Sequence, residues 1–221
     1  MHTYKQLVNE VLIRMREDTV TTIGSSRLAV TDDPVVDIVK LAVEDARRIV
    51  EEAHNWNALR KDWTITTAVG TPTYSLTGAG NRAIIETLYD SQGGVIRNVP
   101  LREIHRKAAV ASQNGSPYIY AVDGADANGD IKIRLHQTPS SVETIQVHGF
   151  QRSKSLNIDS DVCVVPDQPI IYLAFALASR ERGETGGAQS SELFAMAQQY
   201  LSAAIALDSV NSDLDNDWIV R

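Results

Sequence analysis

Apolar side chains recur at intervals of three and four positions in two parts of residues 1–61, and this spacing predicts two amphipathic helices. The first covers residues 4–15. The second begins at Asp33-Pro34, where an acidic N-cap precedes a proline in the first turn, and we expect it to end near Arg60. A loop rich in Thr, Gly and Ser separates the two helices. Their apolar positions are Tyr4, Leu7, Val8, Val11, Leu12 and Met15 in the first helix, and Val35, Val39, Ala42, Val43, Ala46, Ile49, Val50, Ala53 and Trp56 in the second.

From Trp63 the period shortens to two and β-branched residues become frequent, which is typical of half-buried strands. The strand that begins at Tyr74 is expected to return along the first strand, and Asn128-Gly129 predicts a second hairpin. We also expect a short helix from Leu101 after Pro100. Five or six short strands in this part of the chain predict a small sandwich or barrel. The strands are expected at residues 63–69, from 74, 83–89, 118–122, 131–135 and 144–148.

The helical period returns after residue 156. Residues 166–182 are apolar nearly all round, which predicts a central buried helix. A last amphipathic helix follows, and residues 208–221 form a polar, acidic tail. The last helix is expected to bury one face composed of Leu193, Met196, Ala197, Tyr200, Leu201, Ala204 and Leu207.

We therefore expect an α+β fold with three parts. A four-helix bundle is formed by residues 1–61 and 156–208, because helices of this size share one core only if the first and last pairs pack together. Residues 62–155 form an inserted small antiparallel β-sandwich or barrel, and residues 209–221 form an extended C-terminal arm. Trp56 and Trp63 bracket the passage from helix to β module. They either pack as a hinge that sets the orientation of the module or take part in binding.

Composition and charge narrow the classes of function. The 221 residues are 43% apolar and 22% charged, as in ordinary globular proteins. The net charge of −7 disfavours a basic nucleic-acid-binding module, which needs surplus Lys and Arg for phosphates. The whole surplus lies in residues 156–221, which carry 3 basic and 10 acidic side chains. We expect a soluble chain from a reducing compartment, because it has one cysteine, no long apolar run and no evident signal peptide.

No motif in the sequence indicates catalysis, so we expect no enzyme, no cofactor and no metal. The histidines lack the HExxH spacing, although His136 and His148 could face the same side of a hairpin. The acidic run 123–130 lacks the glutamate that would complete a calcium loop, and a polar turn explains it equally well. Cys163 has acidic neighbours in the sequence, whereas a nucleophilic thiol needs an electropositive setting.

Two segments are candidates for binding partners. Arg102, Arg106 and Lys107 form a basic stripe, which is either a solvated face or a contact for an acidic neighbour or a nucleic-acid backbone. At the C-terminus, three aspartates alternate with other residues and are followed by apolar side chains that have no room to form a core. This end is either a frayed terminus or an arm that folds on a neighbouring chain, with Trp218 as its anchor. The candidate docking residues are Asp213, Asp215, Asp217, Trp218, Ile219 and Val220.

Three stretches carry a resemblance to a known family: His54–Trp63, Trp63–Leu76, and Val165–Ala178 together with Leu193–Leu207. They resemble the helix end, first hairpin and closing helix pair of the head-to-tail adaptor proteins of tailed bacteriophages. The most similar type is tail tubular protein A of short-tailed phages. Thr77-Gly78 follow Leu76 where that family often has a proline and an aspartate, so the next turn is expected to differ.

The resemblance implies a structural virion protein in the neck or tail of a phage, assembled in the host cytoplasm. Twelve identical subunits would form a ring that contacts the portal protein on one side. Tail tube, nozzle or stopper proteins would bind on the other side, and genomic DNA would pass through the lumen without specific binding. An acidic wall suits such a conduit, because it repels phosphate. The alternatives are a tail terminator or head-completion protein, and a carbohydrate- or protein-binding β module on a helical bundle.

Overall fold

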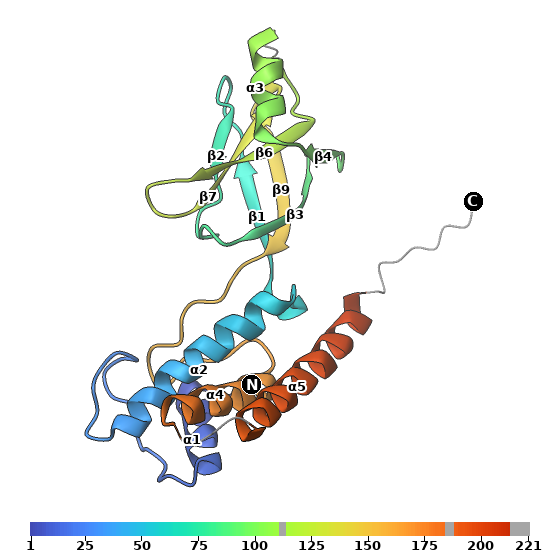
Figure 1. Ribbon diagram of the computed structural model, residues 1–221. Helices are drawn as coiled ribbons and strands as arrows, with labels where there is room; N and C mark the ends of the chain where they lie inside the picture. Colours follow the sequence, from blue (N-terminus) through green and yellow to red (C-terminus); the bar gives the residue numbers. More distant parts are fainter. Residues whose placement is uncertain (111–113, 184–187, 213–221) are drawn as a thin grey trace. The chain divides into compact units, whose positions relative to one another are not determined.

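The computed structural model describes residues 1–110, 114–183 and 188–212 (Figure 1). The described residues form five α-helices and nine strands in a mixed α+β fold. The chain divides into two compact units, which we call the helical unit (Met1–Ala58 and Ser153–Arg221) and the β unit (Leu59–Arg152). No helix in the described part of the chain combines the length and hydropathy needed to cross a membrane.

The helical unit is organised around its third helix, which packs against the other three. Its helices are α1 (Tyr4–Arg14), α2 (Pro34–Ala53), α4 (Asp167–Glu181) and α5 (Ala188–Ser212). The side chains of α1 and α2 that were expected to face the core do so at Tyr4, Leu7, Val39 and Val43. On α4 the small residues Ala174, Ala176 and Ala178 are fully buried, which lets the neighbouring helices approach closely. The main packing partners of α4 are α2 and α5.

Helix α2 ends seven residues earlier than the pattern predicts, at Ala53 instead of near Arg60. The indole of Trp56 folds back, and its Nε1–H donates a 2.9 Å hydrogen bond to the carbonyl oxygen of Val50 in the last turn. That bond satisfies one of the carbonyls left open at a helix C-terminus. A short 3₁₀ turn, Asn57–Leu59, then leads into the β unit. The apolar period continues to Trp56 because this side chain is buried, although it is no longer helical.

A buried ion cluster joins α2 to the segment that returns from the β unit. The guanidinium of Arg47, 3% exposed, pairs with the carboxylates of Glu44 and Glu51, which are equally buried. These carboxylates also accept hydrogen bonds from two backbone N–H groups, Ser153 to Glu51 at 3.0 Å and Leu156 to Glu44 at 3.1 Å. Charged residues of an amphipathic helix ordinarily lie on its solvated side, whereas these three are buried.

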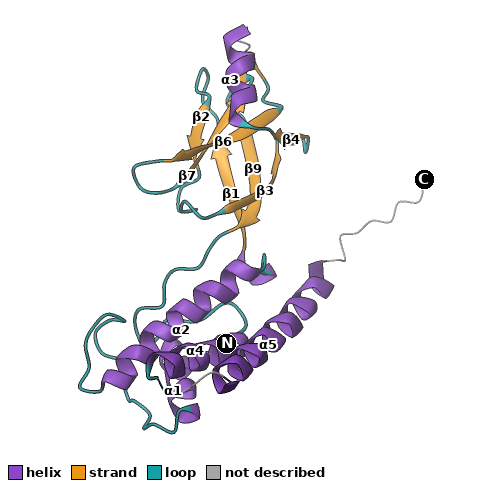
Figure 2. Ribbon diagram, viewed as in Figure 1, coloured by secondary structure: helices purple, strands orange, loops and turns teal. Residues whose placement is uncertain are grey.

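The β unit contains one seven-stranded sheet that curls into a nearly closed, barrel-like module (Figure 2). The strand order is β1-β9-β3-β4-β6-β7-β2, and every pairing is antiparallel except β4 with β6. The sheet strands are β1 (Arg60–Thr66), β2 (Thr73–Ser75), β3 (Ile84–Tyr89), β4 (Val95–Asn98), β6 (Ile119–Ala125), β7 (Ile131–His136) and β9 (Thr144–Phe150). A small parallel pair, β5 (Asn114–Gly115) with β8 (Thr138–Pro139), and helix α3 (Leu101–Val110) complete the unit.

Alternation along the strands places one set of side chains in the barrel core. Trp63 and Ile65 of β1 lie opposite Val147 and Ile145 of β9, and all four are buried. The core of the β unit contains Trp63, Ile65, Leu76, Ala79, Ala83, Leu88, Ile96, Tyr120, Ile131, Ile133, Leu135, Ile145 and Val147.

The hairpin predicted at Asn128-Gly129 is confirmed, because β6 and β7 pair antiparallel across that turn. The hairpin predicted between residues 63–69 and 74 is wrong, because β2 pairs with β7. The Tyr74 hydroxyl donates to the Thr71 carbonyl at 2.6 Å and accepts from the Ala68 N–H at 2.9 Å, so the connection curls on itself instead of returning along β1. Strand β4 was not predicted, since its four residues are too few to show a period.

Candidate partner-binding surfaces

Helix α5 buries a narrower face than its sequence pattern predicts. Ala197 and Leu201 are buried, as expected, and the ring of Tyr200 stacks on that of Tyr172 of α4 at 4.4 Å between centroids. Leu207, however, is 73% exposed, and Met196 is 36% exposed. The expectation that α5 buries these residues together with Leu201 on one face is wrong, because the apolar positions form two faces and α4 covers one of them.

The second apolar face of α5 is continuous and uncharged. Its residues follow one another at steps of four, three, four and three, which is the spacing of a coiled-coil contact line. The helix carries no charged side chain between Glu192 and Asp208. That absence in the sequence is the signal that could have identified the face. We call it the α5 ridge, and it consists of Met196, Tyr200, Ala203, Leu207 and Val210, all exposed, although Tyr172 of α4 covers one side of the Tyr200 ring.

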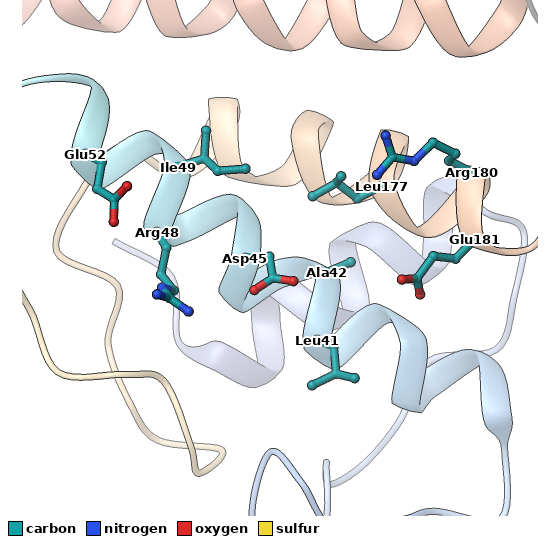
Figure 3. Close-up of a pocket in the computed structure, with 9 residues that line it drawn as sticks. All are labelled: Leu41, Ala42, Asp45, Arg48, Ile49, Glu52, Leu177, Arg180 and Glu181. Carbon is teal, nitrogen blue, oxygen red and sulfur yellow. The ribbon is translucent and has the colours of Figure 1, made fainter.

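A groove with an apolar floor lies between α2 and α4, and we call it the α2–α4 groove. Figure 3 shows Ile49 of α2 and Leu177 of α4 facing one another across it. Leu41 and Ile49 are 45% and 48% exposed, although both belong to a helix whose other face is in the core. The cavity has a volume of about 350 Å³. Its lining residues are Leu41, Ala42, Asp45, Arg48, Ile49, Glu52, Leu177, Arg180 and Glu181.

Polar contacts hold the C-terminal half of α5 beside the end of α2. The Asp208 carboxylate accepts a 3.0 Å hydrogen bond from the backbone N–H of Asn57 and lies 3.2 Å from Nε2 of His54. The Asn57 side-chain amide donates to the Asp208 carbonyl at 3.0 Å. Besides the packing of α5 on α4, three polar contacts of Asp208, the residue next to Leu207, therefore hold the α5 ridge in place on the helical unit.

The two tryptophans expected at the module junction are core residues of different units. Trp56 is 1% exposed in the helical unit, where its ring also meets His54 edge-on at 5.0 Å. Trp63 is 8% exposed in the core of the β unit. The six candidate docking residues at the C-terminus, Asp213, Asp215, Asp217, Trp218, Ile219 and Val220, lie outside the described residues.

The basic stripe of the β unit lies on α3. Arg102 and Arg106 are exposed, and only Ile104 of this helix is buried. Lys107 differs from the two arginines, because its ammonium lies 3.2 Å from the Tyr118 hydroxyl and 5.2 Å from the centre of that ring. The stripe therefore presents two arginines to solvent.

Cys163, the acidic run 123–130 and His148, which were considered above as chemical or metal-binding groups, lie in surroundings that explain them by packing and hydrogen bonding. Burial raises the pKa of Cys163 to about 11, so the thiol is a poor nucleophile. The Asp126 carboxylate accepts the N–H groups of Asn128 and Asp130, and these bonds, that of Asp130 first, lower its pKa. His148 pairs with Asp62 at 2.6 Å. Within the described residues, no three His, Cys, Asp or Glu side chains gather as metal ligands would.

Comparison with protein families places the chain beside a known one. A family model described as SU10 adaptor protein matches residues 2–220, which is nearly the whole chain. A search of curated proteins finds no match.

Proposed function

Because the chain belongs to the SU10 adaptor protein family and is therefore a structural head-to-tail adaptor of a bacteriophage, we propose that it acts as one subunit of a ring. An adaptor of this kind is part of the virion neck and associates with portal and tail proteins. The proposal adds that identical subunits close around a lumen between the portal and the tail. It further adds that the protein is assembled in the host cytoplasm and acts by docking, without catalysis.

The exposed α5 ridge is the observation that most strongly supports the proposed ring. Exposed apolar residues occur singly on most proteins, but a continuous uncharged face on a 25-residue helix is typical of an interface. Burying Leu207 and Val210, 73% and 68% exposed in the single chain, is favourable by roughly 1.5–3 kcal/mol for each fully buried side chain. A protein that leaves this surface uncovered gains from association with further copies.

The ring is proposed to contain twelve subunits, in line with the resemblance to tail tubular protein A. Genomic DNA is proposed to pass its lumen without specific binding. The charge distribution supports this passage, because residues 156–221 hold the whole net charge of −7 and an acidic surface repels phosphate.

The C-terminal arm is proposed to dock on a neighbouring chain, either a sister subunit or the portal. Its sequence supports the idea, because Trp218, Ile219 and Val220 follow three aspartates, and such an apolar end is an anchor for a complementary pocket. Trp56 and Trp63 are proposed to set the orientation of the β unit, because each is buried in the core of its own unit and so anchors one end of the connecting segment.

Co-expression with the portal protein of the same phage tests the function. We expect the two proteins to purify together and native mass measurement to give a ring of identical subunits on the portal. A chain truncated after Ser212 keeps α5 and removes residues 213–221 of the arm, and it should bind the portal or its neighbours less tightly. A chain that binds an isolated tail tube and never the portal would be a tail terminator, and the proposal would be wrong.

A further inference from the structure

We propose that the α5 ridge of one copy docks in the α2–α4 groove of the next copy around the ring. This inference rests on the proposed ring, and it states which surfaces form the subunit interface. Both surfaces belong to the helical unit, so the interface needs no particular placement of the β unit.

The spacing of the ridge indicates the shape of its partner. Steps of four and three residues place Met196, Tyr200, Leu207 and Val210 in one nearly straight line along the helix. A line of this kind packs into the furrow between two helices, as one helix packs on a pair in a bundle. The furrow between α2 and α4 is the cavity of about 350 Å³ described above.

The two surfaces match in length and polarity. The ridge from Met196 to Val210 is about 21 Å long, and the α2 side of the groove from Leu41 to Glu52 is about 17 Å long, at 1.5 Å per residue. An uncharged ridge can enter the groove without removing a charge of its own from water. The groove is also lined by charged side chains of both signs, among them Asp45, Arg48 and Glu181. When the ridge covers the apolar floor, these charged groups can stay in contact with water at the edges of the interface.

A ring requires two different surfaces on each subunit, each used once. A self-complementary patch forms a dimer and stops, whereas a ridge that fits a groove elsewhere on the same chain repeats until the rotation closes. The ridge and the groove are two different surfaces on one unit. For this reason a second copy is the occupant that the structure favours for the groove.

Within one chain, the exposed end of the ridge lies far from the Leu41 end of the groove. Leu207 adjoins Asp208, which is held beside His54 and Asn57 at the C-terminal end of α2. Leu41 lies twelve residues before the last residue of α2, which is about 18 Å along the helix. A link between positions 207 and 41 within one chain therefore exceeds the reach of a short cross-linker, and such a link joins two chains.

Cysteine cross-linking tests the docking directly, and the natural chain suits it because its single cysteine, Cys163, is 1% exposed. Leu207→Cys is mixed with Leu41→Cys in one assembly and with Ile49→Cys in another, on the portal, and each is treated with a short bismaleimide. The two partners mark the two ends of the groove, so either direction of the ridge is covered. Val95→Cys on the β unit, 58% exposed, is the control for collisions.

We expect a covalent dimer in one of the two mixtures, at least tenfold more than with Val95→Cys. A double variant that combines Leu207→Cys with whichever groove cysteine gave the dimer should form a ladder of covalent oligomers longer than a dimer. A ring without a link from 207 to 41 or 49 overturns the docking and leaves the adaptor ring in place. A link between two copies of Leu207→Cys overturns it as well, in favour of ridge-to-ridge pairing. If no ring forms on the portal, the proposed function and the docking are both wrong.

A charge substitution gives a second measurement that does not depend on cross-linking. Leu207→Glu should leave the unfolding midpoint of the chain unchanged, since the side chain is mostly exposed, and should weaken subunit association at least tenfold. Gln198→Glu, which adds the same charge on an exposed face of α5 away from the ridge, should assemble normally. Equal assembly of the two variants would contradict the docking.

Discussion

Replacing Arg47 by methionine tests whether the buried ion cluster holds the helical unit together. The guanidinium donates from Nε to Glu44 at 2.9 Å and from Nη2 to Glu44 at 2.8 Å, and it also pairs with Glu51. Methionine keeps the length of the stem and removes the charge. The substitution leaves two carboxylates, each 3% exposed or less, facing one another without this cation.

The expected loss of unfolding free energy is about 3–5 kcal/mol, the usual cost of removing one partner from a buried ion pair. Arg27, whose Nη1 lies 3.2 Å from Glu44, keeps part of the compensation for that carboxylate. Replacing all three charges by apolar residues should not restore the stability. The N–H groups of Ser153 and Leu156 would then lose their acceptors, at about 1–3 kcal/mol for each buried donor.

Urea unfolding followed by circular dichroism at the helical band measures the effect, and Arg48→Met is the matched control. Arg48 is the next residue on the same helix, is exposed, and loses the same charge on substitution. We expect a midpoint lower by at least about 1 M urea for Arg47→Met and a change within about 0.5 kcal/mol for Arg48→Met. Equal stability of the two variants would refute the reasoning that the cluster is a buried, fully paired network.

Three further predictions concern single groups. At pH 8 the thiol of Cys163 should react with a thiol reagent about a hundredfold more slowly in the folded than in the unfolded chain, because burial raises its pKa to about 11 and so lowers the fraction of thiolate. Equal rates would show the site to be open. Gly149→Ala should destabilise the β unit by about 1–3 kcal/mol, because a Cβ would lie 2.1 Å from the Ile84 carbonyl oxygen. Gly115→Ala, which meets a movable Gln137 side chain, should cost less in the same unfolding measurement. Burial first, and then Lys107, lower the pKa of His136. The folded β unit should therefore lose stability as the pH falls below about 6.5, and a His136→Gln variant should show a flatter pH profile of unfolding.

The order of helices, strands and helices could be predicted from the sequence, because each element shows its own period. The Asp33-Pro34 start of α2 is an example: Asp33 accepts the Val35 N–H at 2.8 Å, as its side chain and position predict. The hairpin at Asn128-Gly129 is another, since that turn needs a residue such as Gly129, which has φ = 82°. The family resemblance of the chain was also contained in the sequence, and the match over residues 2–220 supports it.

Pairing partners and burial depended on the tertiary structure. Strand β2 lies against β7 because the loop before it is closed by the Tyr74 hydroxyl, a contact without a periodic signal. Arg47 of α2 occupies a position that a charge pattern assigns to solvent, and it is buried because the returning segment at Ser153 covers it.

In α5 the sequence predicts the helix but not which of its residues are buried. The sequence by itself determined that this segment is a long helix without charges from Leu193 to Leu207, because helix formation is a local property of neighbouring residues. It could not determine which apolar residues are buried, since the apolar positions of this helix form two faces and either of them could meet the core. Only the tertiary structure decided this, because α4 covers the side with Ala197 and Leu201, and the anchoring of Asp208 at Asn57 leaves Leu207 exposed.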